Sequence, residues 1–236
     1  MIDETDLSQE EKWFHEERAK TVVASLNRKS INAQYVSSKQ EALSAVLEMI
    51  PEGVKVVRGD SMSVDQVGVI EELTKRNKNT VVDPFARDAE GHSIQSRERQ
   101  SIMFREAFTS QIFITGTNAV TLDGKLVNVD ALGNRVAAMI YGPEKVLLIA
   151  GVNKIVKDVH EALERIRNYA APINAKRHYL KHHSPEVGDL PCVRTGKCTD
   201  CNHEWRICNN TVIIEGTWAR AKRRINVVLV GEELGI

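Results

Sequence analysis

Four cysteines within a short stretch are the residues whose chemistry stands out first. Cys192, Cys198, Cys201 and Cys208 follow the pattern C-x5-C-x2-C-x6-C. The acidic N-terminus has no signal-peptide pattern, so we expect the chain in the cytoplasm, where thiols stay reduced and such a cluster indicates metal binding. Four thiolates could hold a zinc ion or the corners of a [4Fe–4S] cluster. Free thiols in an unliganded loop are the alternative.

A polar run between positions 115 and 135 forms a second candidate site. It opens with Thr115-Gly116-Thr117-Asn118 after an apolar strand and closes with Gly133-Asn134-Arg135 at a helix start. Between them, Asn128 and Asp130 alternate with valines, so both can point to one face of a strand. Amides and carboxylates pair with hydroxyls, and arginine binds anions in a bidentate manner. The set suits a hydroxyl-rich or carboxylate ligand, although these residue types also dominate ordinary turns.

A glycine–serine loop forms the third candidate, with Gly59, Ser61, Met62 and Ser63 between a predicted strand and a predicted helix. Ligands of open α/β sheets bind at such turns. Backbone N–H groups at the helix start and two serine hydroxyls favour an anion, whereas Asp60 opposes a highly charged phosphate. The alternative is a tight turn in which Ser63 is an ordinary N-cap.

Strand and helix patterns alternate along the chain and would position these groups. We expect helices over about 8–30, 38–50, from 63, 94–109, from 134, and 153–170 with a second piece to 182. Expected strands are 32–36, 54–57, 80–83, 111–115, 145–150, 211–214 and 225–230, and Asp123-Gly124 indicates a hairpin within 120–129. This alternation predicts an α/β fold with a Rossmann-like, mostly parallel sheet and helices on both faces.

Length and composition fit one domain covering residues 1–236, with an N-terminal helix at about 8–30 and a cysteine-rich, loop-like insertion at about 184–210. Lys plus Arg and Asp plus Glu each number 32, so the chain lacks the basic excess of a nucleic-acid binder. The apolar runs are too short to cross a bilayer, and we expect no membrane association.

Two groups of side chains lie outside these candidate sites. Trp13 and Phe14 are expected to pack in the core or at a homo-oligomer contact. His178, His182 and His183 stand among lysines and arginines, a composition that favours a solvated helix end over a metal site.

Three segments resemble the LUD (lactate utilization) domain family, also named DUF162. Residues 59–69, GDSMSVDQVGV, resemble its glycine–serine loop and helix, 115–137 its second signature, and 230–235 its C-terminal end. The resemblance implies a fold similar to the NagB/RpiA/CoA-transferase group, with a pocket at the strand ends. The chain departs from the family at Asp60, where a second glycine is usual. It also lacks the ferredoxin-like cysteine run of one lactate-utilization subunit type.

The resemblance also implies a function, because some members of the family oxidise lactate to pyruvate beside iron–sulfur partner subunits. We expect segments 59–63 and 115–135 to meet at one rim and bind a small hydroxy-acid, an oxo-acid or a phosphorylated relative. In that pocket Arg135 would hold the anionic group, and Asn128 and Asp130 the hydroxyls. No general base is identified, so whether the chain is an enzyme stays open. The alternatives are a non-catalytic metal or iron–sulfur subunit or redox sensor, and a sugar-phosphate isomerase or CoA-transferase-like enzyme.

Overall fold

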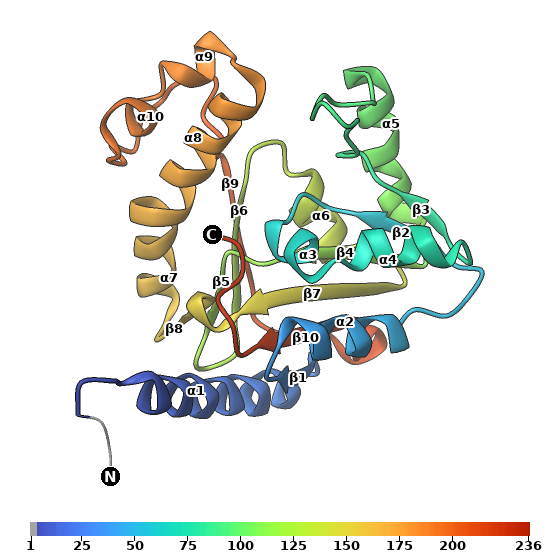
Figure 1. Ribbon diagram of the computed structural model, residues 1–236, viewed down its shortest axis with the longest axis vertical. Coiled ribbons are helices and arrows are strands. Elements are labelled where there is room, and N and C mark those ends of the chain that lie inside the picture. Colours follow the sequence, from blue (N-terminus) through green and yellow to red (C-terminus); the bar gives the residue numbers. More distant parts are fainter. Residues whose placement is uncertain (1–3) are drawn as a thin grey trace.

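The computed structural model describes residues 4–236, and the larger of its two sheets is entirely parallel (Figure 1). Residues 1–3, part of the acidic N-terminus used to predict localisation, lie outside that range. Neighbouring strands follow the order β1-β10-β7-β4-β2-β3. Their bounds are β1 Asn32–Val36, β2 Lys55–Arg58, β3 Thr80–Val82, β4 Ile112–Gly116, β7 Lys145–Gly151 and β10 Ile225–Val230.

Helices cover both faces of this sheet. Val146 and Leu148 of β7 belong to a core shared with α1 (Ser8–Arg28), α5 (Arg97–Glu106) and α6 (Asn134–Ile140). Leu147 and Ile149 belong to a core shared with α2 (Lys39–Glu48), α3 (Met62–Val67) and α4 (Val69–Arg76). Successive side chains of a strand point to opposite faces, so a strand covered on both faces must be apolar throughout. The predicted α/β class with a mostly parallel sheet is confirmed.

A smaller sheet stands at the end of the larger one, with the strand order β8-β5-β6-β9. Its strands are β5 (Ala119–Thr121), β6 (Leu126–Asp130), β8 (Ile155–Val156) and β9 (Asn210–Ile214). The hairpin predicted at Asp123-Gly124 is confirmed, because β5 and β6 pair in antiparallel fashion around it. The sequence patterns did not predict this sheet, since its short strands come from three separate regions of the chain.

The predicted helix over 153–170 was wrong at its beginning. A 3-10 turn, η2 (Val152–Lys154), and strand β8 precede α7 (Val159–Arg165), which begins where the Asp158 side chain accepts the N–H of Glu161 at 3.0 Å. A π-helical segment, η3 (Ile166–Ala170), leads into α8 (Ala171–His182). Pro172 therefore does not interrupt the helix, because the wider π turn before it accommodates a residue without an N–H.

The segment predicted as a loop over 184–210 contains two short helices, α9 (Pro185–Gly188) and α10 (Pro191–Thr195). Val187 and Leu190 pack against Ala175 of α8 and form a small core of their own. This packing fixes the segment to α8, so only residues after Thr195 match the predicted loop. The 3-10 turns η1 (Ala107–Thr109) and η4 (Ala219–Ala221) complete the elements.

Two further expectations can be compared with the fold. Trp13 and Phe14 have exposed fractions of 64% and 49%, so their assignment to the core was wrong, and the oligomer contact stays a prediction. Within residues 4–236, no helix combines the length and hydropathy that a transmembrane span requires.

Gly124 offers a test of the hairpin. It has φ +80°, and a Cβ there would lie 2.8 Å from the backbone nitrogen of Leu26. Gly124→Ala should lower the free energy of unfolding by about 2–4 kcal/mol, measured by urea denaturation, because left-handed strain and overlap with α1 add together. Gly53→Ala is the matched control, since Gly53 has φ +81° but open space around it, and it should cost only about 1 kcal/mol. Equal losses in the two variants would contradict the packing of α1 on the hairpin.

Candidate functional site

The loops that follow β2, β4 and β7 meet at one edge of the larger sheet, because parallel strands end on the same side. They border a cavity of about 330 Å³, which α8 closes on one side and α5 on the other (Figure 1). The volume lies within the usual range of small-molecule pockets. Ser61 and Arg135, which were expected to share one rim, both line this cavity.

The predicted ligand residues divide into two groups. Those that line the cavity are Ser61, Met62, Gly116, Thr117, Asn118, Asp130, Asn134 and Arg135. Those that do not are Gly59, Ser63, Thr115, Asn128 and Gly133. Ser63, Thr115 and Asn128 have no exposed surface at all. The residues of the second group lie behind the cavity surface and do not line it.

Ser61, rather than Ser63, caps the helix after β2. Its Oγ accepts the N–H of Val64 at 3.4 Å, and the N–H of Gly59 donates to the carbonyl of Ile114 at 2.8 Å. Strand pairing thus continues to Gly59, which leaves only Asp60 before the cap and displaces the helix start from the position expected. Because α3 has six residues and a hydroxyl already occupies its first turn, its N-terminus alone is no anion site.

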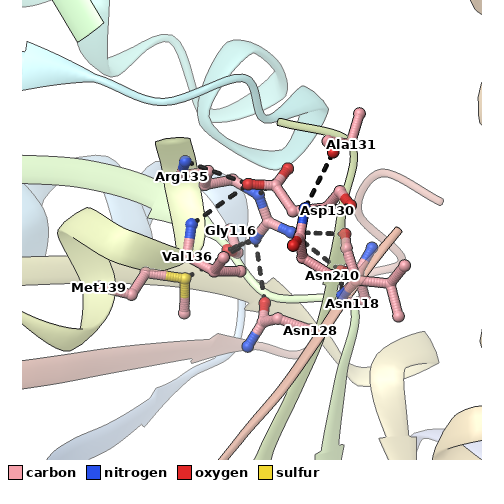
Figure 2. Close-up of polar contacts among 10 residues, drawn as sticks. Gly116, Asn118, Asn128, Asp130, Ala131, Arg135, Val136, Met139 and Asn210 are labelled. Atoms are coloured by element: carbon pink, nitrogen blue, oxygen red, sulfur yellow. Dashed lines mark hydrogen bonds and ion pairs between the residues drawn. The ribbon is translucent and has the colours of Figure 1, made fainter. Parts of the chain in front are cut away.

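Arg135 lies at the centre of a hydrogen-bond network (Figure 2). Its guanidinium donates to Asn128 Oδ1 at 2.9 Å, to Asn118 Oδ1 at 3.0 Å, and to the carbonyls of Gly116 and Val129 at 3.1 and 3.0 Å. The residue is only 8% exposed, and burial lowers the pKa of its guanidinium. These protein acceptors occupy its terminal nitrogens, so the expected role of gripping an anion does not fit the geometry.

Asp130 is occupied in the same network. Its Oδ2 accepts the N–H groups of Arg135 and Val136 at 3.1 and 3.3 Å, and its Oδ1 lies 3.7 Å from Arg135 Nε. This carboxylate caps the first N–H groups of α6. The residue at the N-cap position, Gly133, has no side chain that could accept them. The expectation that Asn128 and Asp130 bind ligand hydroxyls therefore needs correction: both hold the protein's own groups.

Lys154 was missed by the sequence analysis. It ends the 3-10 turn η2 after β7, lines the cavity and is 5% exposed, and its Nζ donates to Ser63 Oγ at 3.0 Å. In residues 4–236, no carboxylate lies within ion-pair distance of this amine. Burial, reinforced by the positive charges of Arg165 and Arg135, lowers the pKa of Lys154 to about 7. The only sequence signal was that Lys154 lies shortly after the apolar strand β7. The other two cavity loops likewise follow apolar strands, β2 and β4.

Cationic side chains outnumber carboxylates around the cavity. Its lining includes Arg87, Arg135, Lys154, Arg177 and Lys181 as cations and Asp60 and Asp130 as carboxylates. The whole chain has a formal net charge of zero, so this excess is local. A concave surface lined mainly by one sign of charge focuses the field and concentrates ions of the opposite sign. The electrostatics therefore favour an anionic ligand.

Helix α8 also brings two histidines to the cavity. His178 and His182 line it, with ring centroids 5.3 Å apart, whereas His183 ends the helix in a left-handed conformation. Burial lowers the pKa of both cavity histidines, and Asp60 partly opposes this effect. The expectation of a solvated helix end is confirmed for His182, which is exposed, but was wrong for His178, which is half-buried where α8 packs over the sheet edge.

The four cysteines are separate from this lining but adjacent to it. All are free thiols, and together they border a second cavity of about 20 Å³. Burial raises the pKa of the Cys192 thiol, and Cys201, Cys208 and Cys198 add to the effect. Ala171 and Ile207 line both cavities, so the thiols lie behind one wall of the larger one.

The four cysteines provide suitable donor atoms for a metal, but their arrangement is not that of a coordination site. Four cysteines around one cavity provide the donor set of a structural zinc or a [4Fe–4S] cluster. Among residues 4–236, however, no three cysteine, histidine or acidic side chains stand in a ready-made coordinating arrangement. Arg206 donates to the carbonyls of Cys201 and Cys208 and holds the backbone of the turn. The donors fit such a group in kind, but metal binding would have to draw them closer together.

A comparison with models of protein families identifies the family of this chain. A model of the LUD domain matches residues 19–230, which is most of the chain. The chain belongs to the LUD domain family. The matched range contains the cavity loops after β2, β4 and β7 and all four cysteines, whereas Gly235 and Ile236, which also line the cavity, lie beyond it. A search of curated proteins gave no match to this LUD-domain chain.

Several solved structures resemble the LUD-domain chain at low identity. A DUF162 family protein from Deinococcus radiodurans has 14% identity and a TM-score of 0.49, with 93% of this chain and 98% of that chain covered. Ribose 5-phosphate isomerase from Plasmodium falciparum has 15% identity and a TM-score of 0.31, with 50% and 52% covered. eIF2B delta from Chaetomium thermophilum has 15% identity and a TM-score of 0.35, with 53% and 50% covered.

Removing the Lys154 amine should stabilise the protein in the absence of ligand. The folded pKa of about 7 lies below the ordinary 10.5, so the unfolded chain binds more protons between these values and wild-type stability rises with pH there. Below pH 7 the amine is protonated in the folded protein, and its burial lowers the free energy of unfolding by the largest amount. Lys154→Met should therefore raise the free energy of unfolding by about 1–3 kcal/mol near pH 6, and the gain should shrink towards pH 10.

Urea denaturation across this pH range provides the measurement. Lys157→Met removes an exposed lysine three positions away and should show no such trend. A stabilisation that does not change with pH would indicate packing by methionine rather than relief of a buried charge.

Proposed function

We propose that this LUD-domain protein binds a small anionic metabolite of the hydroxy-acid or oxo-acid class, or a phosphorylated relative, and serves the metabolism of lactate or similar acids. The observation that supports the proposal is Lys154, which lines the cavity and whose amine has no carboxylate partner among the described residues. A buried cation lacks its solvation, and an anionic ligand would restore a favourable environment for it.

The remaining lining supports the same ligand class. Ser61 provides a hydroxyl donor, and Arg177 and Lys181 provide further positive charge from α8. Among the side chains that we predicted to bind, Ser61, Met62, Gly116, Thr117, Asn118 and Asn134 remain part of the proposed site. Arg135 and Asp130 build its wall.

Calorimetric titration with pyruvate, L-lactate and phosphoenolpyruvate tests the proposal. At least one of these should bind to the wild type, and Lys154→Met should weaken that binding at least tenfold, or about 1.4 kcal/mol, because the central cation is lost. Lys157→Met should bind as the wild type does. Failure of all three acids to bind, or equal affinity in Lys154→Met, would contradict the proposal.

We propose as a second function that the four cysteines hold zinc or a [4Fe–4S] cluster. The supporting observation is that Cys192, Cys198, Cys201 and Cys208 border one cavity behind the wall of the anion site. Zinc would fasten the segment after α10, whereas a cluster would supply one-electron transfer beside the ligand and suit a subunit or sensor that works with iron–sulfur partners. The thiolates would carry negative charge, which the Arg206 side chain at the same cavity would offset.

Anaerobic purification followed by metal analysis and an absorption spectrum distinguishes these forms. One zinc or four irons per chain is expected, with visible absorption that dithionite bleaches in the iron case. The double variant Cys198→Ser, Cys201→Ser should lose the metal, and Lys197→Ala, at an exposed neighbour, should retain it. Wild-type protein without stoichiometric metal would refute this second function.

A further inference from the structure

We propose that Lys154 is a nucleophile that forms a covalent imine with the carbonyl carbon of a 2-oxo acid bound in the cavity. This inference rests on the proposed function, because it names the atom that would react with the anionic ligand. It also narrows the ligand class, since a 2-hydroxy acid has no carbonyl next to its carboxylate and cannot form an imine.

The Lys154 amine is held in a fixed position on a residue that borders the cavity. The stem of the side chain is buried, Nζ bonds to Ser63 Oγ at 3.0 Å, and the residue lines the cavity. Gly235 closes the other side, because a Cβ there would lie 3.1 Å from Nζ and 2.9 Å from Ser63 Oγ. A ligand in the cavity therefore meets an amine held by a hydroxyl rather than a mobile surface lysine.

The surroundings of Lys154 favour the neutral amine that this reaction requires. Two other part-buried lysines have carboxylate partners: Lys55 lies 3.2 Å from Glu106, and Lys125 lies 2.9 Å from Glu215. Lys154 instead has the cations Arg135 and Arg165 as its charged neighbours. Desolvation and nearby positive charge are the two means by which proteins keep a lysine amine unprotonated and nucleophilic.

The cavity also has groups for the carboxylate of a 2-oxo acid. Ser61 brings a hydroxyl from the loop after β2, and Arg177 and Lys181 bring positive charge from α8. Gly116 lets the loops after β2 and β4 approach closely, since a Cβ on it would lie 2.6 Å from Ser61 Oγ. The carboxylate can thus be bound from one side while Nζ faces the adjacent carbonyl carbon.

The reaction needs no further reactant. The Nζ lone pair attacks the carbonyl carbon, a C–N bond forms, and one Nζ proton passes to the former carbonyl oxygen to give a carbinolamine. The nitrogen lone pair then expels this hydroxyl, which leaves with a proton as water, and the C=N bond is complete. The process is reversible and involves no net oxidation or reduction.

Reductive trapping with pyruvate and cyanoborohydride tests the inference. Cyanoborohydride delivers a hydride to the imine carbon, so intact-protein mass spectrometry should show one adduct per chain with the mass of pyruvate less one water plus two hydrogens. Peptide mapping should place the adduct on Lys154. L-lactate with the same reductant should give no adduct, and an excess of L-lactate should reduce trapping by pyruvate at least tenfold by occupying the cavity.

One variant separates the reactivity of the Lys154 amine from its positive charge, and a second variant is the control. Lys154→Arg keeps the cation but cannot form an imine, so it should lose at least nine-tenths of the adduct while binding pyruvate within about tenfold of the wild type. Lys157→Met should be labelled as the wild type is. If Lys154→Arg does not fold, peptide mapping of the wild type decides alone.

The outcomes distinguish this inference from the proposed function. Pyruvate that binds without an adduct on Lys154 would overturn the imine and leave the anion site standing. Trapping spread over surface lysines, and unchanged in Lys154→Arg, would also overturn it. Absence of binding by pyruvate together with the other acids would overturn both.

Discussion

One buried guanidinium holds the candidate site in place. Arg135 bonds to groups at the end of β4, in β6 and in the turn between β4 and β5, and it is itself part of α6. The two sheets of the protein therefore meet around a single side chain. A buried charge is tolerated only when its hydrogen bonds are made, so this arrangement has little freedom to relax. The cavity wall on that side is rigid for the same reason.

Lys154 shows the opposite use of a buried cation at the same cavity. Arg135 has its terminal nitrogens bonded to protein acceptors, whereas Lys154 has one hydroxyl and positive neighbours. Arg135 contributes to the cavity wall, whereas Lys154 has no negatively charged partner among the described residues, and an anionic ligand could provide one. Such a group lowers the stability of the free protein, and this is typical of functional sites, where binding takes precedence over stability.

The segment after α8 connects the two candidate sites of the molecule. Helix α8 carries Arg177 and His178 into the larger cavity, and Leu190 and Val187 pack against it from the cysteine-bearing segment. Ile207, between Cys201 and Cys208, lines both cavities. The cysteine-bearing segment and the larger cavity thus share one wall and one helix.

Local sequence patterns were sufficient to predict the alternation of strands and helices, the hairpin at Asp123-Gly124, the LUD resemblance and two of the segments that border the cavity, 59–63 and 115–135. Each of these depends on local patterns, such as apolar runs that only a doubly covered strand can have. The sequence could not assign roles within the border, because asparagine, aspartate and arginine have the same pattern whether they bind a ligand or one another. Tertiary structure decided that Arg135, Asn128 and Asp130 bond among themselves, and that Lys154 and His178 face the cavity. The physical reason is that a polar group's partners and its loss of solvation depend on atoms far away in the chain, and these are brought near only by folding.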